Sequence, residues 1–177
     1  HMLFEGIEII MHICDIHFLY EYNYWANKKI LAASAGVTHE QFLAPASFPF
    51  GGLRGTLVHL VDAERIWRVL FETQIVTEDQ DLKAEDFQTF ESLEKKFREE
   101  EELMRAYLNR LSDEDMDSHL KYTTTEGARR DRIMWHCHIH LVNHGTQHRS
   151  EAAAILTEYG QSPGELDFTV FLNEWKK

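Results

Sequence analysis

Four long segments of the sequence carry apolar residues that recur every three or four positions, which is the spacing of one face of an α-helix. The helices predicted from this spacing span about 12–35, 53–72, 84–111 and 131–159. All three prolines lie between these segments, where a proline ends a helix and does not disrupt one. Four long amphipathic helices in one chain predict an all-α fold, a four-helix bundle whose apolar stripes face one another.

The stretch "SHLKYTTTEGARRD" (118–131), before the last long helix, departs from the helical pattern. Its threonines and Tyr122 favour extended chain, and Glu126 followed by Gly127 favours a turn. We therefore expect a small hairpin or an ordered loop at this point. Residues 36–52 are expected to form a loop between the first two helices.

The whole chain, residues 1–177, is expected to form a single domain. It contains no internal repeat or low-complexity linker, and it is long enough to bury one core. Residues 1–2 resemble a cloning remnant and are set aside. Gly160 and Pro163 are expected to end the fourth helix. The tail "LDFTVFLNEW" after them predicts a short C-terminal helix that packs on the bundle.

Charge and composition argue against several classes of partner. The formal net charge is −12, so an acidic surface would repel nucleic acid and anionic membranes. No apolar run approaches the length of a bilayer span, and the N-terminus lacks the basic start and cleavage site of a signal peptide. The two cysteines, Cys14 and Cys137, are compatible with a reducing compartment. We expect a cytoplasmic protein with no nucleic-acid partner and no membrane partner.

Five of the eleven histidines fall within thirteen residues of the last predicted helix, namely His136, His138, His140, His144 and His148. At about 100° per residue, the apolar residues of this helix define a core-facing arc about 60° wide. His148 lies inside this arc, and His144 lies about 20° beyond its edge. Spaced four residues apart, these two side chains project side by side and can chelate one divalent cation.

The other histidines of the cluster point away from this pair. A single histidine on an apolar face is most often an ordinary core residue, so the inward pair is the stronger signal. His136, His138 and His140 are interpreted as partly exposed side chains or as groups that line a pocket. Cys137 shares the core face but lies about 10 Å along the axis from His144, so we expect a buried apolar residue there.

A third ligand is predicted on the second helix. His59 lies there in a seam of residues spaced three and four positions apart, so it faces neighbouring helices. Facing His144 and His148, it would complete a set of three histidines. Asp62 and Glu64 are close in sequence but point away from His59, so each is a helix-surface charge or an acceptor for a ligand histidine.

Two further charged features are not assigned to the metal site. The acidic run Glu99–Glu102 is interpreted as a solvated face of the third helix. Arg149 lies about 100° around the helix from His148, so we expect it to pair with a carboxylate and not to reach a substrate.

The chain resembles the DinB/YfiT-like family of metal-binding four-helix-bundle proteins in three stretches, "YNYWANKKIL" (22–31), "HLVDAERIW" (59–67) and "NHGTQHRSEAAAILTEYGQSPGELDF" (143–168). The resemblance implies an up-down-down-up bundle, a homodimer and a cytoplasmic location. In that family, one histidine near the start of the HLxxxExxW helix and two from the HxxxHR helix bind a divalent metal. The matching positions here are His59, His144 and His148.

The resemblance does not fix a reaction, because related subgroups include thiol-dependent transferases, thiol-dependent isomerases and metal-dependent hydrolases. Three neutral imidazoles leave a tetrahedral ion with an open position, and such an ion can activate water or hold a substrate thiolate. We therefore expect a metal-dependent enzyme, a thiol-dependent transferase or a hydrolase, that acts on a small molecule. All-nitrogen ligation suits Zn or Ni, with Fe or Co as alternatives. No catalytic side chain is assigned from the sequence.

The alternative is a non-enzymatic metal-binding or stress-response bundle with a structural metal. A structural site is normally closed by a fourth protein ligand, which His140 or a neighbouring carboxylate could supply. A water molecule or a small anion in the fourth position would favour the enzyme.

The expected partners are a small-molecule substrate, with a low-molecular-weight thiol as one candidate, and a second copy of the chain. Tyr20, Tyr24 and Trp25 of the first helix exceed the number of aromatic residues that one helix needs on its inward face. Together with the family resemblance, this surplus predicts a homodimer.

Overall fold

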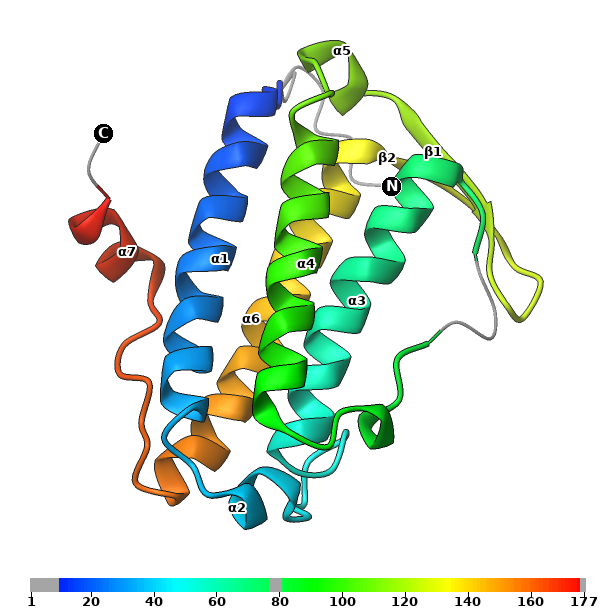
Figure 1. The fold of residues 1–177 in the computed structure, drawn as a ribbon. Helices are drawn as coiled ribbons and strands as arrows, with labels where there is room; N and C mark the ends of the chain where they lie inside the picture. The colour runs from blue at the N-terminus through cyan, green and yellow to red at the C-terminus, as the bar shows by residue number, and fades with distance from the viewer. Residues whose placement is uncertain (1–9, 77–80, 176–177) are drawn as a thin grey trace.

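The computed structural model describes residues 10–76 and 81–175, and four long helices form its frame. They are α1 (Ile13–Ser34), α3 (Leu53–Thr73), α4 (Phe90–Leu108) and α6 (Met134–Glu158). In Figure 1, α1 and α6 run in one direction, and α3 and α4 run in the opposite direction. The prediction of an all-α bundle in up-down-down-up order is confirmed. Within the described ranges, no helix is long and apolar enough to cross a membrane.

The core lies between the four long helices. α6 packs against α1 on one side and against α3 on the other, α3 also packs against α4, and α4 closes the bundle against α1. α6 is therefore covered on two sides. Its buried face must be wider than the single arc that the apolar residues of its sequence outline.

The stretch before α6 forms the predicted hairpin. β1 (His119–Thr123) pairs in antiparallel register with β2 (Arg129–Ile133), and Leu120 lies directly opposite Arg132. The second strand extends up to the start of the last helix. For this reason α6 begins at Met134 and not near residue 131, as the periodicity predicted.

The connections contain short elements that the periodicity did not predict. Residues 36–52 include α2 (His39–Leu43), which starts at a capping box on Thr38, so the expectation of a plain loop is wrong there. α4 begins at Phe90 and not near 84, because Thr89 has an extended backbone and its side chain caps the first turn. The other unpredicted short elements are η1 (Ala84–Asp86) and α5 (Asp113–Met116), whereas α7 (Phe168–Glu174) is the short helix that the sequence predicts in the tail.

α7 is the predicted C-terminal helix, and it covers aromatic residues of α1. It lies beside α1 in Figure 1. Phe171 packs against Trp25, whose indole nitrogen donates a hydrogen bond of 2.7 Å to Glu174. Tyr20 and Tyr24 are buried within the same chain. These aromatic residues are therefore not surplus, contrary to prediction, and they give no reason to expect a second copy of the chain.

His138 is fully buried, so the expectation of a partly exposed side chain is wrong. Its Nδ1 lies 3.0 Å from the hydroxyl oxygen of Tyr20, and the rings of Phe71 and Tyr107 pack against its ring. Burial lowers the pKa of His138 to about 3, so the imidazole is neutral near pH 7. His138 is thus an ordinary core residue, as most single histidines on buried helix faces are.

A buried ion pair joins α3 to α4. Glu100 is only 1 % exposed, and both of its carboxylate oxygens accept hydrogen bonds from Arg68, one of them at 3.1 Å. Arg68 also donates to Glu72 at 2.8 Å. One member of the acidic run Glu99–Glu102 therefore faces inward, which corrects the interpretation of the whole run as a solvated face. The paired hydrogen bonds offset the cost of burying the charge.

We expect Glu100→Leu to destabilise the bundle, because it leaves the buried Arg68 guanidinium without its main partner. The free energy of unfolding, measured by urea denaturation, should fall by about 3 kcal/mol. The double variant Arg68→Met/Glu100→Leu removes both charges and should recover most of that loss. A single variant as stable as the parent protein would show that this pair does not hold α3 against α4.

Candidate metal centre

Two adjacent helices carry the three histidines that the sequence predicts as ligands. His59 is on α3, while His144 and His148 occupy successive turns of α6, and the two helices pack side by side. One ring nitrogen from each histidine lies within 4.8 Å of the other two. The structure thus brings all three together in a group that can hold a metal ion.

The separations of the ring nitrogens fit a single ion. The Nε2 atom of His144 lies 3.3 Å from Nε2 of His59 and 3.2 Å from Nε2 of His148. Two nitrogens bound to one tetrahedral zinc at about 2.0–2.1 Å each lie about 3.3–3.4 Å apart. Both separations therefore match those of ligands on a common ion. Among the described His, Cys, Asp and Glu side chains, no fourth one joins this group.

Glu151 orients one of the three rings. Its Oε2 lies 2.8 Å from Nδ1 of His148, one turn along α6. An ionised carboxylate only accepts hydrogen bonds, so Nδ1 of His148 carries the proton and Nε2 keeps its lone pair. That lone pair is directed at the centre of the histidine group. A carboxylate behind a histidine is the usual arrangement that fixes the tautomer and orientation of a metal ligand.

Burial keeps two of the rings neutral. Burial, with a smaller contribution from the neighbouring His148, lowers the pKa of both His59 and His144 to about 4. A metal binds the neutral imidazole, so these rings are in the binding form near pH 7 without losing a proton.

The group is partly covered by an aromatic side chain from the loop before α3. The ring of Phe50 stacks on that of His59, with centroids 3.5 Å apart and planes 10° from parallel. It also meets the edge of the His148 ring at 5.2 Å. Phe50 itself is 38 % exposed, so it separates the imidazoles from solvent on one side of the group. Nδ1 of His144 is buried without a hydrogen-bond partner among the described residues.

Comparison with known families identifies the chain. The sequence model of the DinB family matches residues 13–177, a range that includes the four long helices and all three histidines. The chain belongs to the DinB family. No curated protein matches it. The family resemblance seen in the three sequence stretches is therefore confirmed across nearly the whole chain.

Two other histidines of this DinB-family chain, His136 and His140, lie outside the group. His136 is exposed, and its ring packs edge-on against Trp135 with centroids 3.9 Å apart. The ring of His140 lies 5.9 Å from that of His144 and 5.1 Å from that of Trp67. The interpretation of these two as exposed or pocket-lining side chains agrees with the structure.

The charged residues near the histidines lie behind them, in the core. Glu64 is buried and accepts hydrogen bonds from the Tyr24 hydroxyl at 2.8 Å and from the Asn23 amide at 3.1 Å. Burial raises the pKa of Glu64 to about 7. Arg149 is also buried and donates to the amide oxygens of Asn23 and Asn27. Glu64 is thus neither a surface charge nor an acceptor for a ligand histidine, and Arg149 pairs with amides where a carboxylate was expected.

Gly145 leaves room for this polar contact. A Cβ at this position would lie 2.8 Å from Nη1 of Arg149 and 3.1 Å from Oδ1 of Asn23. Glycine in the middle of a helix costs about 1 kcal/mol relative to alanine. The close approach of α6 to the Asn23 side chain explains why a glycine occupies this position in spite of that cost.

Two residues that touch the histidines, Glu151 and Phe50, were not predicted from the sequence. A spacing of three residues from His148 could have indicated Glu151, because such residues are neighbours on a helix surface. Phe50 comes from a loop, so no periodic signal points to it. Asp62, which had been considered as an acceptor, is buried and pairs with Arg65 at 2.8 Å.

The role of Glu151 predicts the tautomer of His148. In metal-free protein near pH 7.5, we expect ¹⁵N NMR to show His148 protonated at Nδ1 and unprotonated at Nε2. Glu151→Ala removes the acceptor and should shift the population toward the Nε2-protonated form. Glu158→Ala, the same change on an exposed position of the same helix, should leave it unaltered. Protonation of Nε2 in the parent protein would contradict the assignment.

Proposed function

We propose that this DinB-family protein is a metal-dependent enzyme in which His59, His144 and His148 hold one divalent cation through Nε2. The observation that carries this proposal is the convergence of the three Nε2 atoms, at separations that suit ligands of one ion. The fourth position is left for a small-molecule substrate or for water. The donor set of three nitrogens favours Zn or Ni, with Fe or Co as alternatives.

The residues around the three histidines favour metal binding. Glu151 holds Nδ1–H of His148, so that Nε2 is presented to the ion. Burial keeps the rings of His59 and His144 neutral, and Phe50 shields the His59 ring from water. When bound, the metal supplies a Lewis acid, which suits either hydrolysis or transfer of a group to or from a small thiol.

A purely structural metal is less well supported. Such a site is normally closed by a fourth protein ligand. His140 is directed toward Trp67, and Glu151 is engaged by His148, so neither of the nearest candidates is placed to close it. Within the described part of the chain, only three potential ligands gather at this point. This count favours the catalytic alternative.

Three other properties are proposed on the family resemblance and on composition. A low-molecular-weight thiol is a candidate cosubstrate, the cytoplasm is the proposed location, and a homodimer is the proposed assembly. The homodimer now rests on the resemblance alone, since the aromatic residues of α1 are covered within the chain. The net charge of −12 supports a small-molecule substrate over a nucleic acid.

Metal content tests the choice of ligands. After dialysis, with the N-terminal remnant removed, we expect one metal ion per chain in the parent protein. His59→Ala, His144→Ala and His148→Ala should each lose most of it, because each removes one of three ligands. His136→Ala, an exposed position on the same helix, is the matched control and should retain full occupancy.

Two outcomes would contradict the proposal. Full occupancy in His148→Ala, or loss of metal in His136→Ala, would show that other histidines bind the ion. Loss of metal together with a large fall in thermal stability would support a structural metal. The core of the bundle is mostly aliphatic and aromatic, so the fold should survive the loss of a metal ion that is only catalytic.

A further inference from the structure

A second recess lies beside the histidine group, on the same seam between α3 and α6. This recess, called here the hairpin cleft, has a volume of about 250 Å³, and it is lined by Trp67, Tyr122, Arg132, His136, Cys137 and His140. His140 connects the two places, since its ring contacts Trp67 in the cleft and lies 5.9 Å from the ring of His144. A molecule in the cleft would therefore extend toward the proposed metal ligands.

Arg132 lies at the rim of the hairpin cleft, where its side chain is exposed and also lines the recess. In an antiparallel pair, residues directly opposite each other lie on the same face of the sheet, and the partner of Arg132 is the fully buried Leu120. The Arg132 charge also acts on the Cys137 thiol, where it lowers the pKa against the raising effect of burial. Together with its place among the lining residues, these observations put the Arg132 guanidinium at the mouth of the hairpin cleft.

The guanidinium has no acidic partner there. Its interactions are with Tyr122 and Cys137, and no ion pair joins it to a carboxylate within the described residues. An exposed guanidinium at the mouth of a cleft is accessible to an incoming ligand. Here the planar set of donors is free to take a carboxylate, for which it has matching geometry.

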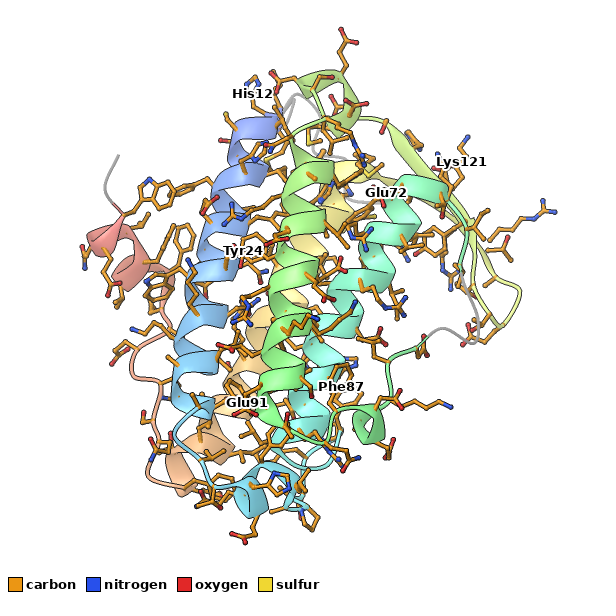
Figure 2. All side chains as sticks on the ribbon, in the orientation of Figure 1. His12, Tyr24, Glu72, Phe87, Glu91 and Lys121 are labelled. Atoms are coloured by element: carbon orange, nitrogen blue, oxygen red, sulfur yellow. The ribbon has the colours of Figure 1, made fainter. Side chains whose placement is uncertain are left out.

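The electrostatics of this end of the bundle favour an anion, although the chain is acidic overall. The positive end of the α6 dipole lies at Met134, next to Arg132, and the residue before the helix is the apolar Ile133, which cannot cap it. Lys121, which Figure 2 shows on the strand beside the upper end of α3, lies on the other face of the hairpin and pairs with Asp131 at 3.7 Å, so it adds no net charge to the cleft. An anion in the cleft would therefore meet Arg132 and the positive end of α6.

The remaining walls suit a flat apolar group. The rings of Trp67 and Tyr122 stand nearly perpendicular at 6.4 Å, and those of Trp67 and His140 lie 5.1 Å apart. Such walls pack well against an aromatic ring. From Cys137 to His144 the helix rises about 10 Å, which is the reach of a small molecule with one aromatic ring and a short chain.

We propose that the hairpin cleft is a subsite for the carboxylate end of an aromatic or similarly flat substrate, with Arg132 binding the carboxylate and Trp67 packing against the ring. The direction of the substrate, with its other end at His59, His144 and His148, rests on the proposed function. The carboxylate contact itself does not, because Arg132 and the cleft walls are present without any metal.

The test uses 2-naphthoate as the probe, with metal-free protein and isothermal titration calorimetry. Arg132→Gln should weaken binding about tenfold or more, the effect of losing a charged hydrogen-bond pair. Arg129→Gln removes the same charge from the opposite face of the same strand, where the register pairs it with Thr123, and should change the affinity less than about twofold. The neutral analogue 2-naphthamide should bind the parent protein no better than 2-naphthoate binds Arg132→Gln.

Two results would overturn the proposal. Equal losses in Arg132→Gln and Arg129→Gln would show that only the general charge of the hairpin matters, and no binding of 2-naphthoate by the parent protein would exclude the subsite. Because the titration is done without metal, it stays decisive even if metal analysis finds that the three histidines bind no ion. Metal content should be the same in Arg132→Gln as in the parent protein, which separates the two claims.

Discussion

One side-chain amide, that of Asn23 on α1, joins the two helices that carry the proposed ligands. Its oxygen accepts a hydrogen bond from Arg149 of α6, and its nitrogen donates one of 3.1 Å to Glu64 of α3. Arg149 directly follows His148 in the chain. Other positions of α6 along α3 could also cover the apolar surfaces, but they would leave these buried polar groups without partners. Because an unpaired buried polar group is costly, the bridge favours one position of α6. The meeting of the histidines depends on that position.

The bundle therefore has a polar interior behind the histidines and an open seam in front of them. Burial lowers the pKa of Arg149 to about 10 and raises that of Glu64 to about 7. Arg149 is held by the hydrogen bonds that it donates to side-chain amides, and Glu64 by the one that it accepts from Tyr24. In front, the proposed metal centre and the hairpin cleft share the seam between α3 and α6, with His140 between them. A rigid support with a recess beside it suits binding of a small molecule at the ligands.

The sequence predicted the long helices and the inward-facing pair His144 and His148 on α6, because the periodicity of apolar residues indicates both. It could not predict the start of α4, which a local cap at Thr89 decides. It also missed the burial of His138, because α6 is covered by α1 as well as α3 and so has a wider buried face than its apolar residues outline. Glu100 and Glu64 looked like surface charges, since their partners, such as Arg68 and Asn23, come from other helices that only the fold brings near.

The central claim is that three histidines hold one cation and leave a position open, and a cobalt titration tests it most directly. The metal-free protein should bind one Co(II) ion per chain, and the bound ion should show the visible absorption spectrum of a four-coordinate site. Adding azide should then change that spectrum in a saturable way, because the anion enters the open position. A spectrum that azide does not alter would mean that a fourth protein ligand closes the site. Failure to bind cobalt would mean that the three histidines are not a metal centre.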